Sequence, residues 1–290
     1  MAQRSFKIFF AEQFLAISAD GRLASAIVDL LFENIPRFDH SVECSEFVLR
    51  DIGPDCCTLV KDGESLIEGD ASAGPNVGEC ATAFLSAVTH SICEHCSSGL
   101  LLHGAAVNYR DTFLLFPGAS GAGKTSTVVH LIQNGAAYLS DELIYVDNSS
   151  RRISCLARPL NIKDGRFGGL GASLESEFLD ASYVVTSGGV FVRPDHFGGR
   201  VSPLSEFLDG PGAIIFPRFC PDDEPELKRS SAGYGYVKLL ETLVNSRNLR
   251  KNGFEDLRKL VDRFPLWEFR FNQHTDLIRS IDHVVDQVDF

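Results

Sequence analysis

The chain has 290 residues, of which 44% are hydrophobic and 23% are charged. This length and composition are typical of one large or two smaller globular domains, and they exclude a disordered or fibrous protein. The net charge of -12 arises from 27 basic and 39 acidic residues, and the basic residues form no concentrated run. We therefore do not expect nucleic acid as a partner.

Targeting signals and cysteine usage predict the cellular context. No apolar stretch approaches the ~20 residues that span a bilayer, and charges interrupt the apolar run near the N-terminus. Eight cysteines in a chain of this length favour reduced thiols over a disulfide framework. The sequence therefore predicts a cytoplasmic protein that makes no membrane contact.

Residues 1–97 predict a β-rich region that ends in a helix. Short runs typical of strands occupy residues 6–10, 14–18, 46–53, 56–60 and 64–69. Lys61-Asp62-Gly63 joins the last two runs and predicts a hairpin turn. Gly74-Pro75-Asn76 then interrupts the chain, and apolar residues at helical spacing predict a helix from Val77 to Ser97.

Residues 98–290 predict an α/β region. A strand at 100–107 turns at Tyr109-Arg110-Asp111 into a strand at 113–117, and a Gly-rich loop leads to a helix over 125–133. Residues 137–147 predict the next strand, so the spacing is typical of a βαβ unit. Further strands are expected at 184–192, 213–217 and 266–271, and helices at 237–248, at 254–264 and from residue 275.

The Gly-rich loop carries the pattern G-x-x-x-x-G-K-[ST] of nucleoside triphosphate-binding proteins. Its glycines let the backbone direct N–H groups at phosphate oxygens, while Lys124 reaches the β- and γ-phosphates and the Thr125 hydroxyl binds Mg²⁺. A buried strand precedes the loop and a helix follows it, and the helix dipole favours an anion there. The expected nucleotide contacts are Gly118, Ala119, Ser120, Gly121, Ala122, Gly123, Lys124, Thr125 and Ser126.

Candidate catalytic residues flank the loop in sequence. Asp141 and Glu142 lie on the strand predicted after the helix, and strand ends of parallel sheets converge on a ligand crevice. Carboxylates there can bind a metal or accept a proton; two solvated acids at a strand edge are the alternative interpretation. His103 lies in the apolar strand before the loop, where a packed histidine is more common than a catalytic one.

The run LLLHGAAVNYRDTFLLFPGASGAGKTSTVVHLIQNGAAYLSDELIYVD, at residues 100–147, resembles the core of HPr kinase/phosphorylase and its related kinases. In that family an HG-containing strand, a short hairpin, a G-x-S-G-x-G-K-[ST] loop, a helix ending in Gly and an acidic pair follow one another at these distances. The resemblance implies an α/β fold with a phosphoenolpyruvate carboxykinase-like P-loop core and a mixed β-sheet. It also implies a kinase that uses ATP and Mg²⁺ to phosphorylate a serine hydroxyl of a peptide or protein.

The resemblance assigns roles position by position. His103 matches the family's active-site histidine, Lys124 and Thr125 match its phosphate and Mg²⁺ ligands, and Asp141 and Glu142 match its Asp-Asp pair. The metal ligands would be Thr125, Asp141 and Glu142, and which acid serves as the base stays open. Glu142 departs from the family's aspartate by one methylene group.

Two departures place the chain closer to a smaller branch of the family. Residues 1–97 do not resemble the usual N-terminal domain, and the downstream signature for phosphate removal has no convincing copy. Some members of that branch act on other substrates, including peptides of modification pathways such as lasso peptides. An ATP sensor that transfers nothing and a kinase of a free small molecule remain alternatives, while ATP versus GTP and homo-oligomerisation are left open.

Weaker features of the sequence each allow more than one interpretation. Arg158 and Lys163 follow the acidic pair and would contact phosphate, or would instead be surface cations or members of an internal ion pair. The Gly-rich segment at 164–171 would be a substrate loop or a connector. Cys93 and Cys96 form a C-x-x-C, which is more typical of packed thiols than of a zinc site because no second ligand pair follows.

Overall fold

The structure is a computed structural model that describes residues 4–38, 41–66, 76–163, 182–202, 210–272 and 275–288. The chain divides into two compact units, one of Met1–His95 and Arg158–His196 and one of Cys96–Ala157 and Phe197–Phe290. Each unit is mixed α/β with a mixed sheet. The sequence predicted one boundary, after residue 97. The return of residues 158–196 to the first unit was not predicted.

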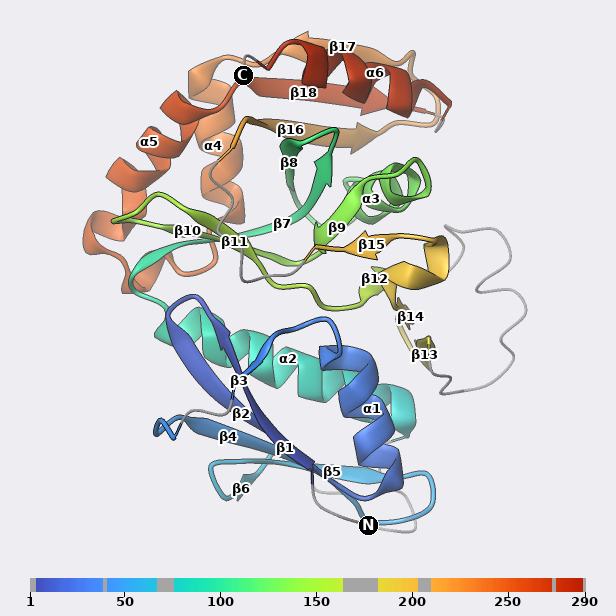
Figure 1. Cartoon of the computed structure of the whole chain (residues 1–290). Helices are drawn as coiled ribbons and strands as arrows, with labels where there is room; N and C mark the ends of the chain where they lie inside the picture. Colours follow the sequence, from blue (N-terminus) through green and yellow to red (C-terminus); the bar gives the residue numbers. More distant parts are fainter. Residues whose placement is uncertain are drawn as a thin grey trace. The chain divides into compact units, whose positions relative to one another are not determined.

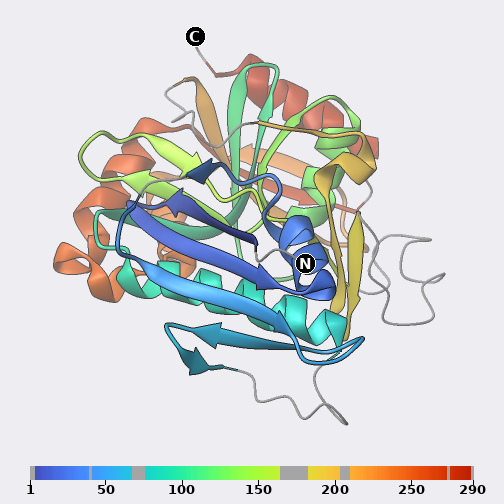
Figure 2. The same ribbon diagram turned by 60° about the horizontal axis from the view of Figure 1, so that its bottom comes forward.

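The first unit contains a six-stranded sheet in the order β3-β1-β2-β4-β5-β6 and a three-stranded sheet in the order β12-β14-β13. Helices α1 and α2 pack against strands of the larger sheet, whose strands lie side by side in Figure 2. The elements are β1 (Arg4–Phe10), β2 (Gln13–Asp20), α1 (Arg22–Phe32), β3 (Arg37–Phe38), β4 (Ser45–Asp51), β5 (Cys57–Lys61), β6 (Glu64–Ser65), α2 (Val77–His95), β12 (Leu160–Ile162), β13 (Tyr183–Thr186) and β14 (Gly189–Val192), followed by the short 3-10 helix η1 (Pro194–Phe197).

Helix α1 is an element that the sequence prediction missed. Its apolar side chains recur at helical spacing and are buried, but no local capping residue marks its start, because Gly21 precedes it. The cap comes from β4 instead: the Asp51 carboxylate accepts hydrogen bonds from the N–H groups of Leu23 and Ala24 at 3.0 and 2.7 Å. A carboxylate at a helix N-terminus satisfies the orphan donors and favours the dipole. The start of α1 is therefore capped by a residue from a distant strand and not by a neighbour in the sequence.

The second unit is built on a nine-stranded sheet whose main path is β11-β10-β7-β8-β16-β18-β17. Helices α4 and α5 pack on one face, and α3 and α6 lie on the other (Figure 1). The elements are β7 (Gly99–Tyr109), β8 (Thr112–Pro117), α3 (Lys124–Gln133), β9 (Ala137–Ser140), β10 (Leu143–Asp147), β11 (Ile153–Cys155), β15 (Arg200–Val201), β16 (Gly212–Phe219), β17 (Glu226–Arg229), α4 (Ala232–Thr242), η2 (Ser246–Asn248), η3 (Arg250–Gly253), α5 (Phe254–Arg263), β18 (Leu266–Phe271) and α6 (Thr275–Asp286).

Strand β7 divides its side chains between the two faces. Leu100 and Leu102 belong to the core under α4 and α5. Because side chains alternate along a strand, Leu101 and His103 point to the opposite face, which α3 contacts. His103 therefore lies on the side of the sheet where the Gly-rich loop begins its helix.

The predicted single strand at 137–147 is wrong in one respect. It is two strands, β9 and β10, separated by Asp141 and Glu142, and both pair antiparallel with β7. Gly104 is the β7 residue at the break, and its N–H donates to the Glu142 carbonyl at 3.0 Å. The two acids thus lie at a break between two strands that both run antiparallel to β7, and the first of these strands, β9, also pairs parallel with β15.

Most other expectations about the elements are confirmed, but the single strand expected at 184–192 is wrong, because this segment is a hairpin of the antiparallel strands β13 and β14. The Asp62-Gly63 turn has positive φ at both residues (50° and 87°) and joins β5 to β6, and the Arg110-Asp111 turn joins β7 to β8. The helix expected at 237–248 instead runs from Ala232 to Thr242, because Ser231 caps its start. The Gly-rich segment at 164–171 lies outside the described residues. Within the described ranges, no helix combines the length and apolar character needed to cross a membrane.

We predict that Asn245→Ala lowers the free energy of unfolding by about 2–4 kcal/mol, because it leaves buried main-chain groups unsatisfied. Asn245 is 2% exposed; it accepts from the Leu101 N–H and donates to the carbonyls of Cys96 and Gly99, each at 2.9 Å. Urea unfolding measures the loss. Asn248→Ala is the control, since this exposed side chain makes a 3.2 Å bond to the Cys96 carbonyl; equal losses in both variants would contradict the prediction.

We also predict a pH-dependent stabilisation by Asp147. Burial opposes its charge, but hydrogen bonds from the Ser150 N–H and from the hydroxyls of Ser149, Ser150 and Tyr145 lower the pKa of Asp147 from 3.8 to about 2. A carboxyl whose folded pKa is lowered stabilises the fold above its unfolded pKa and loses that contribution as pH falls through the folded value. The unfolding free energy of the wild type should therefore exceed that of Asp147→Asn by about 2 kcal/mol at pH 7. The difference should shrink between pH 4 and pH 2, and a pH-independent difference would contradict this assignment.

Candidate functional site

The Gly-rich loop joins β8 to α3, as the motif requires. Gly121 and Gly123 have φ values of 90° and 99°, a region that residues with a Cβ adopt only with strain. Gly123 is the N-cap of α3, and among the described residues no side chain caps this end. The first N–H groups of α3 therefore remain available to an anion, in the helix-terminus geometry that binds phosphate in proteins.

The Lys124 ammonium lies inside the loop that precedes it. The residue is 6% exposed, and its Nζ donates to the carbonyls of Gly118 at 2.7 Å and Ala119 at 3.0 Å. Nζ also lies 3.3 Å from Nε2 of His103. A buried charge needs such partners. The loop thus holds the Lys124 ammonium group at the place where the motif predicts the β- and γ-phosphates of a nucleotide.

The hydroxyl of Thr125 and the carboxylate of Asp141 form a second pair at the loop. Thr125 Oγ1 donates to Asp141 Oδ2 at 2.9 Å and lies 3.2 Å from Oδ1. Asp141 is 5% exposed. Both side chains offer oxygen atoms, the ligand type that Mg²⁺ prefers. Their donor set therefore fits this ion, which typically takes only one or two carboxylates from the protein.

His103 and Glu142 form a third pair, and the contacts define the tautomer of the imidazole. His103 Nδ1 lies 3.5 Å from Glu142 Oε1. Because an ammonium group can only donate, Nε2 of His103 accepts from Lys124, and the imidazole proton then resides on Nδ1, facing the carboxylate. Glu142 is more open than Asp141, with 24% of its side chain exposed. The two acids therefore have different environments.

Ser140 is a residue of the site that the sequence prediction did not identify. Its buried hydroxyl donates to the Leu156 carbonyl at 2.8 Å and accepts from the N–H groups of Glu142 and Leu143 at 3.1 and 3.3 Å. These bonds hold the break between β9 and β10. A serine before an acidic pair is too common a pattern to have indicated this role.

Two aromatic residues pack beside the loop and were also not predicted. The Phe219 N–H donates to the Ala122 carbonyl at 3.2 Å. Phe219 is 44% exposed, and its ring contacts the ring of the buried Phe271 edge to face, with the ring centroids 5.6 Å apart. A Cβ on Gly123 would approach the Phe271 ring to 2.8 Å. The loop therefore follows a path that only glycine permits there. Strands distant in sequence create this constraint.

Arg158, Lys163 and the Cys93–Cys96 pair are the remaining residues that the sequence analysis singled out. Arg158, 7% exposed, and Lys163 belong to the first unit, whereas the loop belongs to the second, so their phosphate contacts stay a prediction. Cys96 follows α2 and donates to the Gly99 carbonyl at 3.6 Å, and burial raises the pKa of its thiol. None of the eight cysteines is in a disulfide. Among the described residues, no group of three or more His, Cys, Asp or Glu side chains could hold a metal ion.

Comparison with known proteins adds little to this geometry. No protein-family model matches the chain, and no curated protein matches it. Among the solved structures that match is one described as the Hpr(Ser) kinase/phosphatase from Coxiella burnetii, with 14% sequence identity and a TM-score of 0.29. The match covers 64% of this chain and 93% of that chain. A TM-score this low carries no argument about fold or activity, so the function is inferred from the residues themselves.

We predict that Gly123→Ala destabilises the protein by about 2–3 kcal/mol, because backbone strain and overpacking against Phe271 add together. Gly135→Ala is a matched control at the other end of α3. Its φ is 94°, close to that of Gly123, but a Cβ there would meet no atom of the described residues within 4 Å. It should cost only the strain, about 1 kcal/mol. Urea unfolding compares the two, and similar losses would show that contact with Phe271 does not constrain the loop.

Proposed function

We propose that this protein is a kinase that binds ATP with Mg²⁺ at the Gly-rich loop and transfers the γ-phosphoryl group to a serine hydroxyl of a peptide or protein. The observation that carries the proposal is the convergence of three pairs on one loop: Lys124 with His103, Thr125 with Asp141, and His103 with Glu142. The serine acceptor rests on the resemblance of residues 100–147 to the HPr kinase-related enzymes.

Binding of the triphosphate is supported by the loop. Its positive-φ glycines, the uncapped start of α3 and the Lys124 ammonium all favour an anion at the same place. Lys124 now donates to the carbonyls of Gly118 and Ala119. Phosphate oxygens would be stronger acceptors, because they carry charge. The ammonium would therefore exchange neutral partners for anionic ones when the nucleotide binds.

The metal would be held by Thr125 and Asp141. Their hydroxyl and carboxylate oxygens already lie together, and Asp141 is too buried to serve a bulky acceptor. When bound there, Mg²⁺ would neutralise part of the charge on the β- and γ-phosphates. Glu142 would not be needed as a direct ligand, which departs from the metal set that the sequence predicted.

Glu142 is then the better candidate for the base. Its carboxylate is partly exposed and close to the protonated Nδ1 of His103, so the imidazole can orient it toward an entering hydroxyl. In the transfer, the serine oxygen bonds to the γ-phosphorus, the bond to the β,γ-bridging oxygen breaks, and the serine proton passes to Glu142. ADP leaves with Lys124 near its β-phosphate. Positioning and charge stabilisation carry most of such a reaction.

We predict that Glu142→Gln lowers kcat about 10²–10⁴-fold and leaves ATP affinity within about threefold, because a general base acts only in the chemical step. Lys124→Ala should abolish ATP binding itself. Glu241→Gln is the control, since this exposed acid on α4 pairs with Lys238. Calorimetry measures binding of Mg·ATP, and transfer of the labelled γ-phosphate is measured with serine peptides, with their Ser→Ala counterparts and with free hydroxyl compounds.

The outcomes separate the alternatives. Label on serine peptides but not on the Ser→Ala forms supports the proposal, and label confined to free compounds would indicate a small-molecule kinase. Wild-type protein that binds Mg·ATP and labels no acceptor would overturn the kinase proposal in favour of a nucleotide-responsive binding module. Wild-type protein that binds no nucleotide would overturn the role of the loop itself.

A further inference from the structure

Three parallel strands end beside the Gly-rich loop. Strands β8, β16 and β18 lie next to one another and run in the same direction. The loop follows the carboxyl end of β8, and the last residues of β16 and β18, Phe219 and Phe271, are paired in register. Ligands of open α/β sheets bind outside the carboxyl ends of parallel strands. The end of β16 therefore lies where a molecule held by the loop can reach it.

The ring of Phe219 is fixed beside the start of α3. Its N–H donates to the Ala122 carbonyl of the loop at 3.2 Å, and a Cβ on Gly123 would lie 3.4 Å from the Phe219 Cβ. The ring packs edge to face on Phe271, which in turn stacks on Phe269 with ring centroids 5.2 Å apart. Phe269 and Phe271 are buried, whereas Phe219 is 44% exposed. A row of three aromatic rings thus ends in one that a ligand can contact.

The proposed chemistry takes place on the other side of β8. His103 lies on β7, and Asp141 and Glu142 lie at the break between β9 and β10, which both pair with β7. In the sheet order, β7 and β16 are the two neighbours of β8 on the main path. An acceptor that reaches Glu142 would therefore meet the γ-phosphate on the β7 side. The nucleoside, attached to the opposite end of the triphosphate, would then extend toward β16 and Phe219.

We propose that the ring of Phe219 is the surface on which the base of the bound nucleotide stacks. The inference rests on the proposed function, because it needs a nucleotide at the loop. Stacking on an aromatic ring contributes affinity whatever the identity of the base, since every base has a π-face. Phe219 would therefore favour ATP and GTP alike, and would distinguish both from a triphosphate that has no base. It is a binding residue and takes no part in the transfer.

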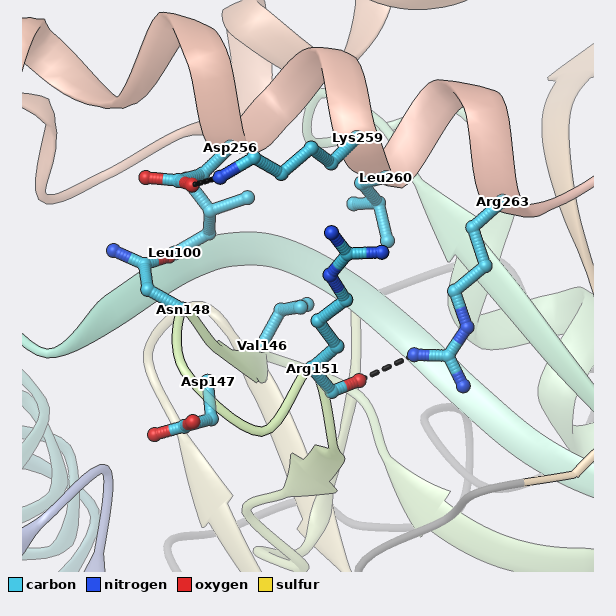
Figure 3. Close-up of a pocket in the computed structure, with 9 residues that line it drawn as sticks. All are labelled: Leu100, Val146, Asp147, Asn148, Arg151, Asp256, Lys259, Leu260 and Arg263. Atoms are coloured by element: carbon cyan, nitrogen blue, oxygen red, sulfur yellow. Dashed lines mark hydrogen bonds and ion pairs between the residues drawn. The ribbon is translucent and has the colours of Figure 1, made fainter.

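The pocket on the α5 face of the sheet does not compete for the base (Figure 3). Leu100, which lines it, belongs to the core under α4 and α5, whereas α3 lies on the other face. Figure 3 shows two contacts in its lining: Asp256 pairs with Lys259 at 2.6 Å, and the Arg263 guanidinium donates to the Arg151 carbonyl. Its free space of about 20 Å³ is roughly what one water molecule needs. A nucleobase does not fit there.

The test compares the binding of Mg·ATP, Mg·GTP and magnesium tripolyphosphate to the full chain by calorimetry. Phe219→Ala should lower the affinities for ATP and GTP about tenfold, which is the order of effect that loss of one stacking ring gives. The affinity for tripolyphosphate should stay within about twofold, because this ligand has no base to stack. Phe219→Tyr keeps the aromatic ring and should bind both nucleotides within about threefold of the wild type.

Phe254→Ala is the matched control. Phe254 is exposed to the same degree, 45%, but it begins α5, which packs on the opposite face of the sheet from α3 (Figure 1). The same truncation there removes an exposed ring without touching the loop. It should leave all three affinities within about twofold.

The outcomes separate this inference from the kinase proposal. Equal weakening of nucleotides and tripolyphosphate by Phe219→Ala would overturn the inference, since the ring would then only support the loop. Unchanged nucleotide affinities in Phe219→Ala, nucleotide binding by Phe219→Tyr as weak as by Phe219→Ala, or an equal loss in Phe254→Ala would also overturn it and leave the kinase proposal standing. Wild-type protein that binds none of the three ligands would refute the role of the loop, and the stacking site with it.

Discussion

The buried ammonium group of Lys124 is the constraint on which the candidate site depends. A charge that is almost withdrawn from water must be surrounded by acceptors, and here the acceptors are two carbonyls of the loop and the imidazole of His103. The loop must therefore curl back over its own lysine, which the positive φ values of Gly121 and Gly123 allow. The same need positions β7, since His103 has to reach the ammonium. One hydrogen-bonding requirement thus links the loop, the helix and the strand beside them.

The break between β9 and β10 gives the two neighbouring acids different environments. In an unbroken strand, Asp141 and Glu142 would point to opposite faces of the sheet. Here Ser140 holds a bend, Asp141 reaches the Thr125 hydroxyl, and Glu142 reaches the imidazole of His103. A buried carboxylate beside a hydroxyl suits a metal, and a partly exposed carboxylate beside an imidazole proton suits an entering hydroxyl. The proposed division of roles rests on this local irregularity, which antiparallel pairing with β7 on both sides of the break makes possible.

Long-range contacts explain what sequence reasoning missed. Helix α1 has its cap on β4, so no residue next to its start could indicate it. The contact between Phe271 and Gly123, and the contact of Arg263 with Arg151, join residues far apart in the chain; the last two are 112 positions apart. The return of residues 158–196 to the first unit is of the same kind, because strand pairing with distant partners leaves no periodic signal of its own. Turns and single helices, by contrast, can be predicted from residues that are adjacent in the sequence.

The sequence by itself determined the Gly-rich loop, the hairpins at Asp62-Gly63 and Arg110-Asp111 and the helix after the loop, since each depends on the conformational preferences of a few adjacent residues. It also named the residues that the loop would need, His103, Asp141 and Glu142. Only the tertiary structure decided which acid contacts which partner, where the proton of His103 lies and that Arg263 contacts the turn between β10 and β11. Those outcomes depend on strand register and on packing between distant segments, where a shift of one residue along β7 would turn every side chain to the other face.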